Sequence, residues 1–240
     1  MTAPLNNYNV AAKEKRPDII KIAKTFNGIP DCEDYEKMIS GMLYDPFIPV
    51  LQKARYKARG LAAKFNNLDA NTVPYEKVAE IQFGHLKNLL GRVGENTFIE
   101  PPFLPDYGCN VSIGKDTFIN WNMTILDTSI VVIGDRVMIG TNVSIISAGH
   151  ETSVLSRRKM VEFGHPVFIG DDCWIGSNVV ILPGVTIGEG CTIGAGSIVT
   201  KDIPPFSVAY GNPCRVQKTI PSAEEEENDP NNPYRNLTRG

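Results

Sequence analysis

The stretch VFIGDDCWIGSNVVILPGVTIGEGCTIGAGSIV, residues 167–199, decides the fold of this chain. An aliphatic residue recurs there at every sixth position: Ile169, Ile175, Ile181, Ile187, Ile193 and Val199. A period of six matches neither the 3.6-residue period of a helix nor the alternation of a hairpin meander. It is typical of a parallel β-helix built from hexapeptide repeats, in which each short strand points one side chain inward. We expect the glycines that follow four of these residues to adopt positive φ at the corners.

The same spacing of six recurs upstream in two runs that are separated by an eight-residue step: Ile113, Ile119 and Ile125, then Ile133, Ile139 and Ile145. Residues 149–166, GHETSVLSRRKMVEFGHP, interrupt it. We interpret this segment as a loop that leaves a corner of the solenoid, and we interpret the isoleucines as core. Loops of this length inside a compact domain are usually functional, so we expect the function on the corners and on this loop.

The composition excludes several classes of protein. The net charge of -3 over 240 residues gives no electrostatic reason to bind nucleic acid or an anionic membrane. The longest apolar run is too short to span a bilayer, and the N-terminus lacks the apolar centre of a signal peptide. The five cysteines form no CxxC pair, which favours reduced structural thiols in a cytoplasmic protein.

The flanks of the repeat region differ from it in pattern. We expect a weakly ordered extension over residues 1–30, with a helix from Pro17 to Phe26, and a helical domain over residues 31–92. One expected helix has a basic face, which we interpret as solvated surface: Lys53, Arg55, Lys57, Arg59 and Lys64. The β-helix domain then covers residues 93–218, and residues 219–240 form an acidic tail that we expect to be disordered.

The chain has three histidines, and one of them stands at a corner. His85 lies on an expected helix, and we interpret His165 as a surface or packing residue. His150 follows Ser-Ala-Gly at the point where the repeat stops and the loop begins. A neutral imidazole can take a proton from a hydroxyl group near pH 7. The residues alone leave His150 open as a general base or as an ordinary loop histidine.

A resemblance to a known family adds to this. Residues 34–218 resemble the maltose, galactoside and nodulation-type sugar O-acetyltransferases of the hexapeptide-repeat family. The segments that carry the resemblance are EKMISGMLYDP, IEPPFLPDYGCNVSIG, FINWNMTILD, IGDRVMIGTNVSIISAGH, IGDDCWIGSNVVILPGVTIG and IGAGSIVTKDIPPFSVAYGNPCRV. It implies a mainly β fold, a left-handed parallel β-helix with a small N-terminal helical domain. It also implies a homotrimer with sites between subunits, acetyl-CoA as co-substrate, a sugar hydroxyl as acceptor and no required metal.

The resemblance assigns roles to individual residues. His150 falls on the catalytic base of the family, and Glu162 matches an acidic loop residue. The acceptor side is implied for Asn120, Asp127, Asp106 and Asp45, although Thr128 replaces the acidic residue expected after Asp127. The coenzyme A side is implied for Trp174, Ser177, Ala195, Thr200, Lys201, Arg215 and Lys218. Trp174 has the alternative of a core residue, but a hexapeptide solenoid has little room inside for an indole.

Other functions stay open at this point. One is an acetyltransferase of the same fold with a non-sugar acceptor. A second is a metal-dependent hydratase of the carbonic anhydrase type, which needs three imidazoles converging on zinc; the places of the three histidines argue against it. A third is a catalytically silent scaffold, against which the joint presence of His150, Asn120 and Trp174 argues.

Overall fold

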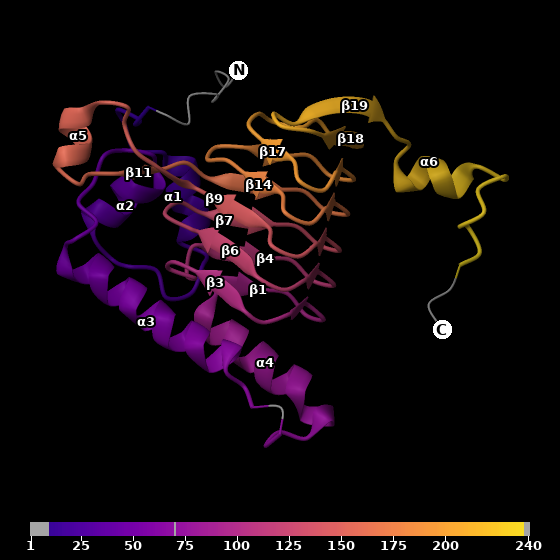
Figure 1. Cartoon of the computed structure of the whole chain (residues 1–240), viewed down its shortest axis with the longest axis horizontal. Coiled ribbons are helices and arrows are strands. Elements are labelled where there is room, and N and C mark those ends of the chain that lie inside the picture. The colour runs from indigo at the N-terminus through magenta and orange to yellow at the C-terminus, as the bar shows by residue number, and fades with distance from the viewer. Residues whose placement is uncertain (1–9, 70, 238–240) are drawn as a thin grey trace.

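In the computed structural model, which describes residues 10–69 and 71–237, the middle of the chain winds into a parallel β-solenoid with three sheets (Figure 1). The first sheet contains β1 (Arg92–Val93), β4 (Val111–Ile113), β7 (Val131–Ile133), β12 (Val167–Ile169) and β15 (Thr186–Ile187). The second contains β2 (Phe98–Ile99), β5 (Phe118–Ile119), β8 (Met138–Ile139), β13 (Trp174–Ile175), β16 (Thr192–Ile193), β18 (Ser207–Tyr210) and β19 (Arg215–Thr219). The third contains β3 (Phe103–Pro105), β6 (Met123–Leu126), β9 (Ser144–Ile146), β14 (Val180–Ile181) and β17 (Ile198–Val199). The parallel β-helix predicted from the period of six is confirmed.

Each coil places aliphatic side chains in the interior of the solenoid. In the second sheet, one buried isoleucine lies beside the next in register: Ile119, Ile139, Ile175 and Ile193. Because side chains alternate between the two faces of a strand, the residue before each isoleucine points outward. The interior is therefore uniform from coil to coil, while the outer residues are free to carry function.

The glycines that directly follow the repeat isoleucines do not supply positive φ at the corners, as was expected. Gly176 does not adopt positive φ, but a Cβ atom added to it would lie 2.6 Å from the backbone nitrogen of Ala195 on the next coil. The left-handed conformation belongs instead to residues such as Asn142 and Asn178, with φ of 58° and 59°, and asparagine tolerates it better than most residues. The glycines are needed for close approach between coils, and the expectation of positive φ was wrong.

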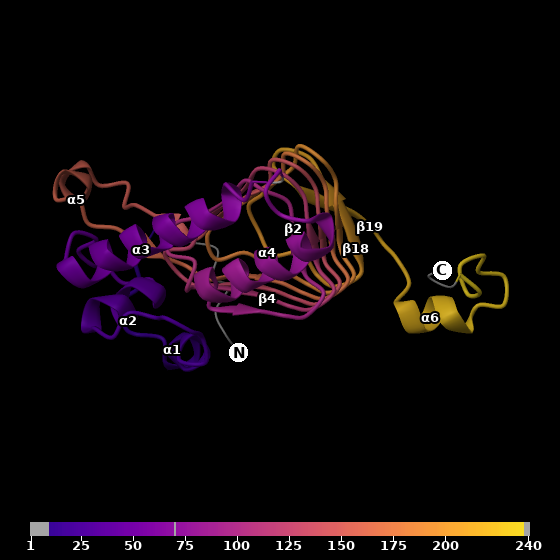
Figure 2. The same ribbon diagram turned by 90° about the horizontal axis from the view of Figure 1, so that it is seen from below.

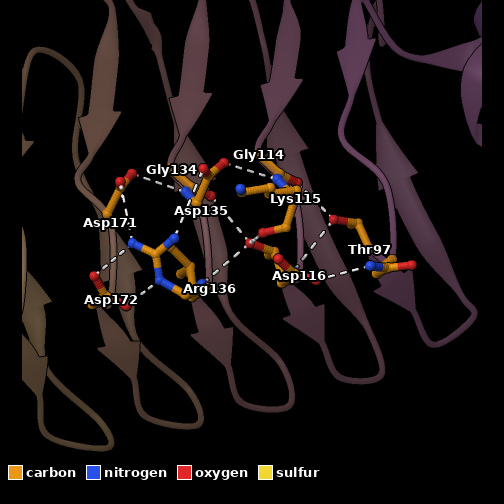
Figure 3. Close-up of polar contacts among 12 residues, drawn as sticks. Thr97, Gly114, Lys115, Asp116, Gly134, Asp135, Arg136, Asp171 and Asp172 are labelled. Atoms are coloured by element: carbon orange, nitrogen blue, oxygen red, sulfur yellow. Dashed lines mark hydrogen bonds and ion pairs between the residues drawn. The ribbon is translucent and has the colours of Figure 1, made fainter.

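The corner between the first and second sheets is held by aspartates that bond from coil to coil (Figure 3). Oδ1 of Asp171 accepts from the backbone nitrogen of Asp135 at 2.9 Å, and Oδ1 of Asp135 accepts from that of Lys115 at 2.9 Å. Arg136 adds a paired contact with Asp172, at 2.6 and 2.8 Å. These carboxylates already have protein partners, so we assign this corner to stability.

Two helices close the N-terminal end of the solenoid, α3 (Pro49–Asn66) and α4 (Tyr75–Leu89). Figures 1 and 2 show them across the first coils. Phe65 of α3 and Leu86 of α4 are buried in the same core as the repeat isoleucines. The solenoid and its helical end are therefore packed as one body, and the helices predicted between residues 31 and 90 are confirmed.

The N-terminal segment packs more firmly than its composition suggests. Helix α1 (Pro17–Ala23) lies within the range expected to be helical, and α2 (Glu33–Ile39) follows it. Ile19 and Ala23 of α1 are buried in a second core with Tyr107 and Ile130. The expected extension is thus docked from α1 onward by apolar contacts, while residues 1–9 lie outside the described range.

The acidic tail also contains a helix, α6 (Ala223–Asn228), where composition predicted disorder. A capping box explains it: Ser222 Oγ accepts from the Glu225 nitrogen at 3.2 Å, and Glu225 Oε2 accepts from the Ser222 nitrogen at 2.7 Å. The helix projects away from the solenoid (Figure 2). Residues 238–240 lie outside the described range. No helix in the described part of the chain combines the length and apolarity needed to cross a bilayer.

The predicted loop is an arm that leaves the corner between the third and first sheets. At its base β10 (Ala148–Gly149) pairs antiparallel with β11 (Phe163–Gly164), and α5 (Val154–Arg158) lies at its tip. The arm and α3 lie on one side of the solenoid and α6 on the opposite side (Figures 1 and 2). A bridge between Tyr44 and Glu162 joins the arm to the helical segment.

Candidate active site

The base of the arm holds a histidine and a carboxylate side by side. His150 follows β10 and Glu162 precedes β11, so the antiparallel pairing places them opposite each other. Nε2 of His150 lies 3.7 Å from Oε2 of Glu162, and Nδ1 lies 3.4 Å from the carbonyl oxygen of Val161. About half of the His150 side chain is exposed, so the ring is held on one side and open to a ligand on the other.

A buried tyrosine fixes the carboxylate from behind. The hydroxyl group of Tyr44 donates to Oε1 of Glu162 at 2.7 Å. Burial, with the nearby Tyr107 and Glu162, raises the pKa of Tyr44, so the hydroxyl group keeps its proton and remains a donor. Tyr44 thus leaves Oε2 of Glu162 facing the imidazole.

A cation and a second carboxylate complete this cluster. Arg55 on α3 bonds the hydroxyl oxygen of Tyr107, lies over its ring at 5.3 Å, and donates to the carbonyl oxygen of Pro46 at 2.6 Å. Burial raises the pKa of Asp106, and the positive charges of Arg55 and Arg59 oppose that shift. Asp106 is therefore a partly buried carboxylate between the helical segment and the arm.

Asp127 supports this region from inside the protein. Its side chain is fully buried, and Oδ1 accepts from the backbone nitrogens of Asp106 and Tyr107 at 2.8 and 2.9 Å. Oδ2 has no hydrogen-bond partner among the residues that the structure describes, and burial raises the pKa of this carboxyl group to about 7. Asp127 thus shapes the turn that carries Asp106 and does not reach the surface.

The corner between the second and third sheets carries a different set of expected residues. Asn120 begins this corner and accepts from the backbone nitrogen of Trp121 at 2.8 Å. Ser177 and Ala195 stack one coil above the other, and the hydroxyl groups of Ser177 and Thr141 lie 3.2 Å apart. Together these residues form a column that runs along the solenoid.

Trp174 lies on the outer face of the second sheet, beside that column. Its side chain is 54% exposed, so it is not a core residue. Its in-register neighbour Met138 is 56% exposed and Phe118, on the next strand, is 40% exposed. The three form a continuous apolar strip, which is unusual on a free surface.

The remaining expected coenzyme A residues lie near the C-terminal coils. Thr200 and the exposed Lys201 follow β17, at the corner from which the arm leaves two coils earlier, after β9. Arg215 and Lys218 are exposed on β19, opposite Tyr210 and Val208. These three cations lie at the same end of the solenoid.

One chain therefore brings together only part of the predicted site. It places His150, Glu162 and Asp106 in one cluster, with the exposed Asp45 directly after Tyr44. Asn120, Ser177, Ala195 and Trp174 lie beyond the third sheet. The strands of the third sheet, which are two to four residues long, separate the two corners by a span on the order of 10 Å.

Three residues of the cluster were not among the predicted site residues: Tyr44, Arg55 and Tyr107. Tyr44 stands beside Asp45 in the LYDP motif, and Arg55 was assigned only to the basic face. Their burial and mutual hydrogen bonds come from residues far apart in the chain. The motif was the only available signal, and it pointed to the neighbouring residue.

The histidines lie on separate elements. His85 lies on α4, and His165 is buried against Gly41 with Nε2 3.0 Å from the carbonyl oxygen of Val10. Burial lowers the pKa of His165, as expected for a packing residue. Within residues 10–69 and 71–237, no three His, Cys, Asp or Glu side chains are grouped to hold a metal ion.

Two family descriptions match the chain. The description "Maltose acetyltransferase hexapeptide capping motif" matches residues 37–94, which cover the end of α2, all of α3 and α4, and β1. The description "Bacterial transferase hexapeptide (six repeats)" matches residues 166–201, the later coils of the solenoid. The two matched segments are the helical end and the later coils of the solenoid, which pack together in one core.

Relatives match over most of the chain. The galactoside O-acetyltransferase of Escherichia coli K12 is 42% identical over 185 residues, 77% of this chain and 88% of that protein. The sophorolipid acetyltransferase of Starmerella bombicola is 34% identical over 232 residues, 93% of this chain and 88% of that protein. A solved structure of a galactoside acetyltransferase in complex with coenzyme A superposes with a TM-score of 0.74 and 38% identity, covering 81% of this chain and 94% of that one.

Proposed function

Because this chain belongs to the hexapeptide-repeat acetyltransferases with a maltose acetyltransferase capping motif, we propose that it transfers the acetyl group of acetyl-CoA to a hydroxyl group of a sugar or glycoside. The observation that carries the proposal is the imidazole of His150, open on one face and backed by Glu162 and Tyr44. The relatives above act, by their names, on a galactoside and on a sophorolipid, so the proposal commits to a sugar hydroxyl and not to one sugar.

His150 acts as the general base. A neutral ring nitrogen takes the proton of the acceptor hydroxyl group while that oxygen attacks the thioester carbonyl carbon. The tetrahedral intermediate then expels the coenzyme A sulfur, which receives the proton from the imidazolium. The acetyl group moves directly from sulfur to oxygen, and no residue of the chain is acetylated.

Glu162 and Tyr44 are positioning residues. The carboxylate of Glu162 faces the ring at 3.7 Å and stabilises the positive charge that the ring gains during the reaction. Tyr44 donates to the other carboxylate oxygen at 2.7 Å and so fixes the orientation of the Glu162 carboxylate toward the ring. Because the ring is half exposed, water weakens the attraction, and orientation is the larger contribution.

The acceptor side is formed by Asp106, Asp45 and Asn120. Asp106 lies within range of the charge of Glu162, and the exposed Asp45 directly follows Tyr44; both have oxygens that can accept from sugar hydroxyl groups. Asn120 offers an amide group that can both donate and accept. Asp127 acts through the backbone of Asp106 and not by contact with the sugar.

The coenzyme A side follows the column at the second corner. Trp174 packs on the pantetheine arm, and Ser177 and Ala195 meet its amide groups. Thr200 and Lys201 lie along the nucleotide end. Arg215 and Lys218 meet the phosphates, because guanidinium and ammonium groups make charge-assisted hydrogen bonds to phosphate oxygens.

The active form is a homotrimer whose sites lie between subunits. Two observations support this: Trp174 and His150 lie at different corners of one chain, and the apolar strip around Trp174 is uncovered. Side-by-side packing of two solenoids covers the strip and places the His150 arm of one subunit against the donor column of the next. Cyclic symmetry closes this arrangement after three copies.

The cytoplasm is the proposed location. All five cysteines are unpaired, and four of them are buried in the packed body. Free thiols in this number suit a reducing compartment.

An acceptor panel tests the function. Purified protein with acetyl-CoA is offered galactosides, glucosides, maltose, serine and chloramphenicol, and thiol release is followed. Release with sugars and not with serine or chloramphenicol is the expected result. Release only with a non-sugar acceptor would replace the sugar with that acceptor, and no release with any of them would remove the function.

A further inference from the structure

Helix α3 carries an open groove of about 830 Å³ on its solvent side. The residues that line it are Phe47, Gln52, Lys53, Arg55, Tyr56, Lys57 and Arg59. Four of the seven are cationic and none is acidic, although the whole chain carries a net charge of -3. The groove is therefore a local positive site on an otherwise weakly acidic protein.

The groove also exposes aromatic surface. Phe47 is 51% exposed and Tyr56 is 80% exposed, while the opposite face of α3 packs into the core through Leu51 and Ala58. No ion pair joins Lys53, Lys57 or Arg59 to a carboxylate within residues 10–69 and 71–237. Simple solvation explains scattered lysines on a helix, but it does not explain cations gathered in one hollow with two uncovered rings.

The groove is continuous with the proposed acceptor side. Arg55 lies in its wall and at the same time bonds Tyr107 and Pro46. Arg55 and Arg59 are close enough to Asp106 to lower its pKa against the effect of burial. A molecule with one end at Asp106 can therefore extend into the groove. From Gln52 to Arg59 the helix rises roughly 10 Å, which sets the length of the part that fits.

We propose that this groove binds the aglycone of the acceptor, and that the acceptor is a glycoside whose aglycone is apolar and ends in an anionic group. The proposal rests on the function proposed above. Phe47 and Tyr56 cover the apolar part, and Lys53 and Lys57 meet the anion. The sugar then lies at Asp106 with a hydroxyl group at His150.

Four β-galactosides separate the contributions of the aglycone: methyl, octyl, 8-methoxycarbonyloctyl and 8-carboxyoctyl. The last two compounds share the same nine-carbon chain and differ at its end, where the ester has a neutral methyl ester group and the acid has a carboxylate. We expect kcat/KM to rise from methyl to octyl, and to be about tenfold higher for the acid than for its methyl ester, which corresponds to two partly exposed charge pairs. The measurement is thiol release from acetyl-CoA below saturation.

Variants assign the effects to the groove. The double change Lys53→Gln with Lys57→Gln should bring the ratio of acid to ester close to one, and Tyr56→Ala should reduce the ratio of octyl to methyl. The matched control is Lys77→Gln, an exposed lysine on α4 outside the groove, which should keep both ratios. Equilibrium binding of the 8-carboxyoctyl galactoside, measured calorimetrically without acetyl-CoA, provides a readout that needs no turnover.

The outcomes are distinguishable. Turnover of all four galactosides with equal kcat/KM would overturn the groove while leaving the sugar acetyltransferase intact. No turnover with any glycoside, but binding of the acid that depends on Lys53 and Lys57, would overturn the proposed function and retain the groove. Binding of the protein to anionic vesicles, with no difference between acid and ester, would assign the groove to a membrane surface and overturn the proposal.

Discussion

The hydroxyl group of Tyr44 donates a 2.7 Å hydrogen bond to Glu162, a residue 118 positions later in the chain. Tyr44 precedes α3 and Glu162 lies in the arm, so this bond ties the helical segment to the element that carries His150. It connects a buried tyrosine, through a carboxylate, to an exposed imidazole.

Tyr44→Phe should lower kcat by about tenfold, because the bond it removes is made to a charged group and that charge orients the ring. The KM values for acetyl-CoA and for the sugar should change little, since neither substrate contacts the hydroxyl group. Steady-state kinetics with both substrates varied measure this. Tyr35→Phe is the matched control: it also removes a buried hydroxyl group, bonded to Asn110, and should affect stability more than kcat. Equal kcat losses in the two variants would contradict the positioning role.

His150→Ala should leave acetyl-CoA binding nearly intact and lower turnover by about 10²–10⁴-fold, the usual contribution of a positioned general base. Binding is measured by calorimetry and turnover by thiol release. His85→Ala, on α4, is the control and should behave as the wild type. Unchanged turnover in the His150 variant would show that another group removes the proton.

Trp174→Ala should raise the KM for acetyl-CoA more than the KM for the sugar, because the indole is proposed to pack on the pantetheine arm. Its exposure of 54% means that the change removes little core packing. Tyr75→Ala, at an aromatic residue on α4 that is 88% exposed, controls for a general surface effect. A larger rise in the KM for the sugar would place Trp174 on the acceptor side.

Asp127 should make stability depend on pH. Its pKa is raised from the usual 3.8 to about 7 by burial, so the folded state favours the protonated form. The stability from this group is full below pH 4 and is lost as pH rises through about 7. Asn at position 127 cannot ionise, so the variant does not lose this stability. As pH rises from 4 to 7, the free energy of unfolding of Asp127→Asn should therefore increase relative to that of the wild type, by at most a few kcal/mol. Urea unfolding of both proteins at pH 5 and pH 8 measures the difference; parallel pH profiles would show that Asp127 is ionised without cost.

The homotrimer should have a mass of about 79 kDa by light scattering, three times 26.4 kDa. A shared site also predicts complementation. When His150→Ala and Trp174→Ala chains are coexpressed, about a quarter of the interfaces in a random cyclic trimer carry both native residues. Activity at low acetyl-CoA should then exceed that of either variant alone. A fully active monomer, or no recovery in the mixture, would place Trp174 and His150 in a site within one chain.

The sequence determined the repeat architecture because its signal is local and periodic. The aliphatic residues at each sixth position from Ile169 to Val199 contact only the neighbouring coils, so their spacing alone predicts the solenoid. The interruption of that spacing marks the arm. The same pattern, with the resemblance to a known family, singled out His150. The placement of Trp174 outside the core was also predictable, because six residues per face leave no space inside for an indole.

The tertiary structure alone decided which groups surround that histidine. The bond from Tyr44 to Glu162, the buried Asp127 and the groove beside Arg55 depend on how α3 and the arm fold back onto the solenoid, which no local period encodes. The steric reason for a glycine at position 176 could not be predicted from the sequence, since it depends on the backbone of the next coil. Periodic short-range contacts can be read from a sequence, whereas hydrogen bonds between distant residues and burial of single carboxylates are set only when the chain has closed on itself.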